Sequence, residues 1–157
     1  MDNKNIEEIV NKVVNAVKKT TLNLDEARYI VRRVEEEAEK IGVKAVVAVA
    51  DSGANIICVE CMDDSYIASY DIAVNKAFTS VSLKMPTKTL KTLAQPGAEL
   101  YGIQNTNNGK IVIFGGGVPI VYAGKVIGGV GVSGGSEKQD TYLGDYALKV
   151  FEEIFNK

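Results

Sequence analysis

The feature that most constrains the fold of this chain is a glycine-rich stretch at residues 110–136, KIVIFGGGVPIVYAGKVIGGVGVSGGS. Short runs rich in Val and Ile, bounded by glycine clusters, are typical of strands joined by tight turns. The stretch predicts three consecutive strands, Ile111–Phe114, Val118–Ala123 and Val126–Ser133. Gly124 suits the reversal between the last two, because it tolerates the positive φ that such turns need. Strands joined by short reversals form a largely antiparallel sheet.

The last of these strands carries glycine where a strand usually carries side chains. Val126, Gly128, Val130 and Val132 are expected on one face, and Ile127, Gly129, Gly131 and Ser133 on the other. Glycine inside a strand usually marks a bulge or the close approach of a ligand or another backbone. We therefore expect one face of the sheet to be bare of side chains, so that it admits a ligand or a neighbouring chain.

Two amphipathic helices are predicted before the first strand. Asn23, with Glu26 three residues later, predicts a capping box at the start of the second helix, and Gly42 suits the position after its end. We expect residues 1–20 to form an extra N-terminal helix, outside a single domain that spans residues 21–157. The apolar stripe of the first helix consists of Ile6, Ile9, Val10, Val13, Val14 and Val17.

The middle of the chain predicts a hairpin followed by helices. Val43–Ala50 is continuously apolar, as expected of a central strand covered on both faces, and Ile56–Met62 returns beside it. Together with the three later strands, these elements predict an α+β domain built on an antiparallel sheet flanked by helices. The remaining elements are helices at Ile67–Met85, Thr87–Leu93 and Glu137–Phe155, and a long loop at Gln95–Asn108.

Composition narrows the classes of function. The formal net charge is −2 without a basic stripe, which argues against nucleic acid as a partner. No apolar run approaches the roughly 20 residues of a membrane span, and the N-terminus has no continuous apolar stretch typical of a signal peptide. With only two Cys, we expect a cytoplasmic protein without disulfides. The chain contains no His, so the commonest general base, metal ligand and proximal haem ligand are all lacking.

Several polar residues have both a functional and a structural interpretation. Cys58 and Cys61 form a C-x-x-C pair, but no second pair exists for zinc, and their spacing places them on opposite faces of a strand, which favours ordinary strand residues over a metal site. The neighbours Asp63 and Asp64 are favoured as turn residues over an acid/base pair.

Lys76 is the candidate cation of the predicted third helix. It lies beside the apolar stripe, where it could reach an anionic group, although a surface Lys with a partly covered stem is the favoured alternative. Asp71 is a similar case. The run Phe114-Gly115-Gly116-Gly117 could expose backbone N–H groups as an anion nest, or could simply be a bend.

Six blocks of this sequence together resemble the GlcG/HbpS haem-binding family, whose domain also forms the C-terminal part of PduO-type proteins. The resemblance covers about residues 22–155 and leaves out the first helix. The blocks are Asn23–Ala27, Ala48–Gly53, Asp71–Ala77, Gln95–Gln104, Ile113–Ile120 and Val126–Gly135, with Gln139-Asp140 after them.

The resemblance implies a profilin-like fold with a five-stranded antiparallel sheet, and assembly into homo-oligomers from dimers to octamers. It also implies binding of haem or a cobalamin-type corrinoid, with links to diol or glycolate metabolism. Where many members read Q-H-T-N, this chain reads Gln104-Asn105-Thr106-Asn107. If haem binds here, its axial ligand is expected to be a Thr or Tyr oxygen, Met or Cys, or to be lacking.

Three hypotheses follow. In the first, a small-molecule binding protein holds a tetrapyrrole between the loop and the glycine bend, with Tyr101 stacking on the ring. In the second, an enzyme acts on a small carboxylate or aldehyde, with Lys76 and Asp71 or Asp140 as acid/base pair. In the third, the chain is a structural subunit whose first helix packs across a symmetry axis. The ligand-binding residues of the first hypothesis are Tyr101, Gln104, Asn105, Thr106, Gly115, Gly116, Gly117 and Lys76.

Overall fold

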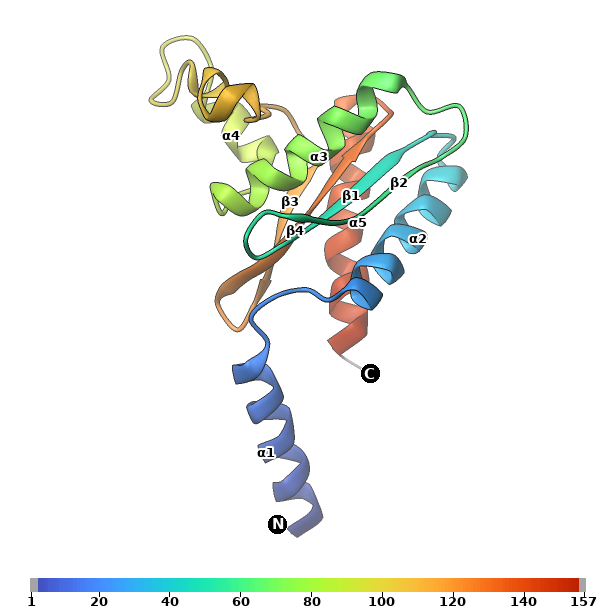
Figure 1. The fold of residues 1–157 in the computed structure, drawn as a ribbon, viewed down its shortest axis with the longest axis vertical. Coiled ribbons are helices and arrows are strands. Elements are labelled where there is room, and N and C mark those ends of the chain that lie inside the picture. Colours follow the sequence, from blue (N-terminus) through green and yellow to red (C-terminus); the bar gives the residue numbers. More distant parts are fainter. Residues whose placement is uncertain (1–2, 156–157) are drawn as a thin grey trace.

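The computed structural model describes residues 3–155, in which a four-stranded antiparallel sheet has helices on both faces (Figure 1). The strand order is β2-β1-β4-β3, so β1 and β4 are central. Helix α3 covers one face, whereas α2 and α5 cover the other. The strands are β1 (Val46–Asp51), β2 (Ile56–Cys61), β3 (Gly117–Tyr122) and β4 (Lys125–Ser133). The helices that cover the sheet are α2 (Leu24–Lys40), α3 (Ile67–Ser82) and α5 (Glu137–Phe155).

The sheet has four strands rather than the predicted five, because Ile111–Phe114 is not a strand. Side chains of the flanking helices bind the backbone of this segment and of the bend after it. The Val112 N–H donates to Thr79 Oγ1 of α3 at 3.0 Å, and the Gly115 N–H donates to Glu137 Oε1 of α5 at 3.0 Å. The α+β class and the antiparallel sheet between helices are confirmed.

The bare face of β4 is occupied by α3, so the expectation that it admits a ligand is wrong. A Cβ atom at Gly131 would collide with the Ala73 carbonyl oxygen and would lie 2.6 Å from the Ala77 nitrogen. A Cβ at Gly129 would lie 2.5 Å from Ser80 Oγ. The backbone that approaches these glycines closely is therefore that of the chain's own helix.

The predicted alternation of β4 holds for its second half and fails for its first. Val130 and Val132 face α2 and α5, as expected, but Ile127 joins them while Val126 packs on the α3 side. The cause is a register shift between Ile120 and Val121 of β3, which inserts an extra residue in β4. Such a bulge reverses the faces of the residues on one side of it.

The helix signals in the sequence are largely confirmed. Asn23 and Glu26 form a capping box at the start of α2, and Gly42 has a φ of 70° after its end. Pro86 separates α3 from the short helix α4 (Thr87–Leu93). The long loop contains two single-turn helices, η1 (Ile103–Asn105) and η2 (Asn107–Gly109).

Helix α1 (Asn3–Lys18) extends away from the sheet and from the other helices (Figure 1). Five members of its apolar stripe are between 40% and 55% exposed: Ile6, Ile9, Val10, Val13 and Val14. The side chain of Val17 lies outside the described residues. Within residues 3–155, none of the helices combines the length and the apolar character that crossing a bilayer requires.

Candidate functional site

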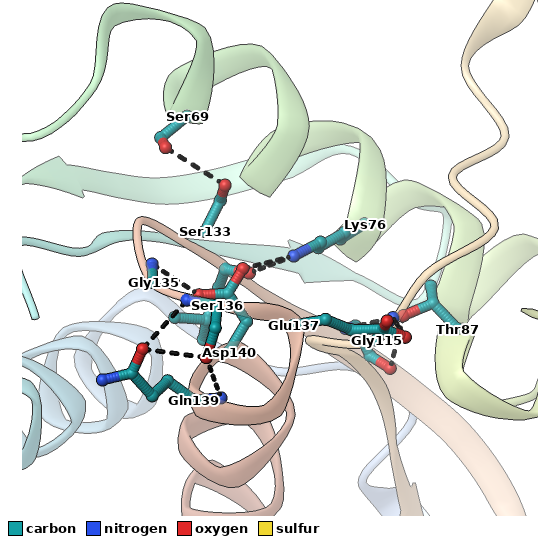
Figure 2. A network of polar contacts seen from close by, with 12 residues as sticks. Ser69, Lys76, Thr87, Gly115, Ser133, Gly135, Ser136, Glu137, Gln139 and Asp140 are labelled. Atoms are coloured by element: carbon teal, nitrogen blue, oxygen red, sulfur yellow. Dashed lines mark hydrogen bonds and ion pairs between the residues drawn. The ribbon is translucent and has the colours of Figure 1, made fainter.

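Lys76 of α3 is fully buried against the end of β4 and the start of α5, which contradicts its favoured interpretation as a surface residue. Its Nζ donates to Asp140 Oδ2 at 2.8 Å and to the Val132 carbonyl oxygen at 2.8 Å (Figure 2). The same nitrogen lies 4.9 Å from the centroid of the Phe114 ring. The ammonium group thus has two hydrogen-bond acceptors and a cation–π contact within the chain.

Burial dominates the electrostatics of this ion pair. It lowers the pKa of Lys76, against the attraction of Asp140, which raises it. It also raises the pKa of Asp140, against the charge of Lys76 and the hydrogen bond from Gly135. Both shifts favour the neutral forms, so the environment makes each charge costly without the other.

Asp140, not Asp71, is the partner of Lys76. Asp140 lies in the first turn of α5, where its second oxygen, Oδ1, accepts the Gly135 N–H at 2.9 Å. Ser136 and Gln139 cap the same turn, because the Ser136 N–H donates to Gln139 Oε1 at 2.9 Å. Asp71 is exposed, and its carboxylate accepts from the Asn75 side chain. Asp140 therefore joins α3, the end of β4 and the start of α5.

The glycine bend at residues 115–117 is bound mainly by the chain itself. The Gly115 N–H donates to Glu137, which also pairs with Lys91 of α4. The Gly117 N–H donates to Thr87 Oγ1 at 2.9 Å. The ion pair with Lys91, and then the bond from Gly115, lower the pKa of Glu137. Two of the three N–H groups of the predicted anion nest thus already have acceptors, one of them a carboxylate.

Two hollows lie beside this network, and the turn at Gly134 and Gly135 lines both. The first, of about 260 Å³, is lined by Tyr66, Ile72, Phe114 and Asp140 among others. The second, of about 460 Å³, is lined by Lys44, Asp64, Tyr66, Ser136 and Gln139 among others. Tyr66, Gly134 and Gly135 belong to both, so we treat the two as one depression and name it the Tyr66 cleft. Its larger half has the volume of a small-molecule pocket, typically about 300–1,000 Å³.

The loop residues that the sequence predicted as ligand contacts do not line the Tyr66 cleft. Tyr101 is 65% exposed, and Asn105 and Thr106 are exposed as well. The Thr106 hydroxyl donates to the Ile103 carbonyl oxygen at 2.7 Å. Gln104 Oε1 is buried and has no hydrogen-bond partner among the described residues. A role of this loop in binding stays a prediction, with the unpaired Gln104 oxygen as its main support.

Sequence reasoning missed Tyr66, which lies immediately before α3 at its N-cap position. In the sequence, Tyr66 stands out only as an aromatic residue that follows a polar turn. Helical periodicity begins after it, so the pattern could not predict which way its side chain points. Glu137 was likewise predicted only as a helix residue. Cys58 and Cys61 are free thiols, and within residues 3–155 no group of three His, Cys, Asp or Glu side chains could hold a metal ion.

Comparison with known proteins assigns most of the chain to one type of domain. Residues 22–149 match the family model described as haem degrading protein HbpS-like. An uncharacterized 15.0 kDa protein of Citrobacter freundii, from the dhaT-dhaS intergenic region, is 46% identical over 134 residues, which are 85% of this chain and 94% of that protein. The part of this chain outside the match is therefore about as long as α1 together with the segment that links it to α2.

Two further relatives connect the domain with tetrapyrroles. The corrinoid adenosyltransferase PduO of Citrobacter freundii is 34% identical over 82% of this chain, but the match spans only 38% of PduO. The crystal structure of PduOC in complex with haem superposes with a TM-score of 0.80 at 35% identity, covering 83% of this chain and 94% of that one.

Proposed function

Because the chain belongs to the HbpS-like family, we propose that it is a tetrapyrrole-binding protein that holds haem or a corrinoid in the Tyr66 cleft. The similarity to PduOC, which was crystallised with haem, supports the class of ligand. The observation that carries the location is the cleft itself, in which two hollows share a Gly-Gly turn and Tyr66, and Phe114 lines the first hollow.

The first hollow fits the chemistry of a flat, largely apolar ring, whereas the second is lined by Lys44, Asp64, Ser136 and Gln139, which suit the polar groups at the edge of such a ring. Tyr66 and Phe114 offer aromatic surfaces on which such a ring stacks. Gly134 and Gly135 line both hollows with backbone. When bound, haem would supply an iron centre, whereas these residues would orient the ring and shield it from water.

Absorbance titrations test the proposal directly. Haemin and a cobalamin are each added to the purified protein, and we expect a saturable spectral shift with at least one at tens of micromolar. Tyr66→Ala should weaken binding about three- to tenfold, since stacking on one aromatic ring contributes about 0.5–1.5 kcal/mol. No spectral change with either ligand would refute the proposed function.

The predicted loop serves as the rival location in the same experiment. Tyr101→Ala is the matched variant, because Tyr101 is a similarly exposed tyrosine that does not line the Tyr66 cleft. If Tyr101→Ala weakens binding and Tyr66→Ala does not, the ligand site lies in the loop, with Gln104 as a contact. The expected result is the reverse.

We further propose that the protein acts as a cytoplasmic homo-oligomer in diol or glycolate metabolism. The exposed apolar stripe of α1 supports self-assembly, because such a face is normally covered by a partner. Light scattering on the full chain and on a variant without residues 1–18 tests this role of α1.

The buried ion pair favours a second candidate function, an acid/base reaction on a small aldehyde or carboxylate. Burial lowers the pKa of Lys76, and Asp140 lines the first hollow of the cleft. Such a pair would exchange the α-hydrogens of a carbonyl compound with deuterium from solvent, which NMR detects. Exchange that is no faster with the wild type than with Lys76→Met would exclude this function.

A further inference from the structure

The chain must supply an unusual ligand to any metal held in the Tyr66 cleft, because it contains no His. Haem iron in proteins is bound by His, Cys, Met or Tyr side chains. Of these four residue types, the residues that line the two hollows include one member, Tyr66. Accepting the proposed function as its basis, we infer that the phenol oxygen of Tyr66 is the axial ligand of bound ferric haem.

Tyr66 has the placement that such a ligand needs. It lines both hollows and is 74% exposed, so its ring projects from the protein surface at the middle of the cleft. Its backbone is fixed at the N-cap of α3, where its carbonyl oxygen accepts the Ser69 N–H at 2.9 Å. The residue therefore combines a rigid attachment with an accessible hydroxyl group.

The Tyr66 hydroxyl is also unoccupied, unlike several others in the described part of the chain. The hydroxyl groups of Tyr142 and Tyr146 are bound by Glu37 and Arg33. In contrast, no residue among 3–155 forms a hydrogen bond with the Tyr66 hydroxyl. Coordination of a metal by Tyr66 would break no existing contact.

Competing oxygen donors in the cleft are mostly engaged. Asp140 is paired with Lys76, and Glu137 is paired with Lys91. Ser69 and Ser133 are joined through their hydroxyl groups at 3.1 Å, as Figure 2 shows. Asp64 is the exposed carboxylate that lines the second hollow, and it is the natural competitor to test.

Spectroscopy of the haemin complex separates this inference from the proposed function. Wild type is compared with Tyr66→Phe, Asp64→Asn and Tyr70→Phe, the last being a control on an exposed tyrosine of α3 that does not line the cleft. Resonance Raman and absorbance spectra report a phenolate bound to ferric iron. We expect this signature in the wild type, in Asp64→Asn and in Tyr70→Phe. In Tyr66→Phe the signature should be lost and the dissociation constant for haemin should rise.

Each other outcome overturns a definite statement. If the wild type binds haemin and Tyr66→Phe retains the wild-type spectrum, the ligand assignment is wrong while the proposed function stands. If Asp64→Asn alone changes the spectrum, a carboxylate is the ligand and Tyr66 is not. If the wild type binds neither haemin nor cobalamin, the proposed function fails. Circular dichroism on each variant verifies the fold, which these exposed positions should not affect.

Discussion

The buried pair of Lys76 and Asp140 should be strongly coupled energetically. Their Nζ and Oδ2 atoms lie 2.8 Å apart, and the two side chains are only 0% and 5% exposed. At an effective dielectric constant of about 20, unit charges at this separation attract each other by about 6 kcal/mol. Most of that attraction offsets the cost of removing both charges from water, so the pair adds little net stability. Removing one partner is nevertheless strongly destabilising, because the other charge then stays buried without compensation.

Two conservative substitutions expose this coupling. Lys76→Met removes the amine and keeps most of the volume, whereas Asp140→Asn removes the charge and keeps an oxygen for the Gly135 N–H. Each single variant should lower the free energy of unfolding by about 3–5 kcal/mol, because it leaves a buried charge without its partner. The double variant should lose less than the sum of the two by about 2 kcal/mol or more.

Urea unfolding followed by circular dichroism measures these free energies, at several protein concentrations in case assembly contributes. The matched control is the pair Lys88–Asp145, which has the same 2.8 Å separation but side chains that are 45% and 42% exposed. Lys88→Met and Asp145→Asn should each cost at most about 1 kcal/mol. If the two buried variants prove additive, or if Lys76→Met is as mild as Lys88→Met, the reasoning is refuted.

Three further predictions concern the surroundings of the site. Partners lower the pKa of Glu137, so its carboxylate contributes stability above its ordinary pKa of 4.5 and loses it as the pH falls through the lower folded value. Glu137→Gln should therefore cost about 0.5–1 kcal/mol at pH 7 and almost nothing near pH 3, as measured by urea unfolding at both. Gly131→Ala should cost about 3 kcal/mol or more because its Cβ meets the backbone of α3. Gly124→Asn has open space around its Cβ and only the strain of a φ of 75°, so it should cost about 1 kcal/mol; equal effects would contradict the packing argument. Deleting residues 1–18 should leave the unfolding free energy within about 0.5 kcal/mol and should lower the number of subunits found by light scattering, whereas an unchanged number would exclude α1 from assembly.

Local signals in the sequence predicted most of the fold. The Asn23 capping box, the continuous apolar strand that became β1 and the stop at Pro86 each depend on neighbours in sequence, and each appears in the structure. The segment Ile111–Phe114 has the composition of a strand but lies beside helix side chains that bind its backbone. Strand composition describes a half-buried surface in general, so it could not identify which partner the backbone would find.

The site was less predictable because its residues meet from distant parts of the chain. Lys76 and Asp140 are 64 residues apart, and neither position reveals the other. Helical periodicity placed Lys76 at the edge of the apolar stripe, where a surface position is the usual outcome. Its burial depends on the distance between α3 and the sheet, which no property of α3 alone determines.

That distance is set by the glycines of β4, and it is consistent with a proposed ligand site at the edge of the sheet rather than on its face. Without side chains at Gly129 and Gly131, the backbone of α3 contacts the strand directly and fills the face on which a ligand was expected. The same close packing brings Lys76 Nζ within 2.8 Å of Asp140 Oδ2 and of the Val132 carbonyl oxygen. Helix α3 therefore contacts the rest of the domain both through its backbone and through the buried ammonium group of Lys76. This packing leaves no space for a ligand on the sheet face, and the proposed Tyr66 cleft lies where α3 begins, next to the end of β4 and the first turn of α5. Tyr66 lies at that point, at the N-cap of a helix whose backbone packs directly against β4.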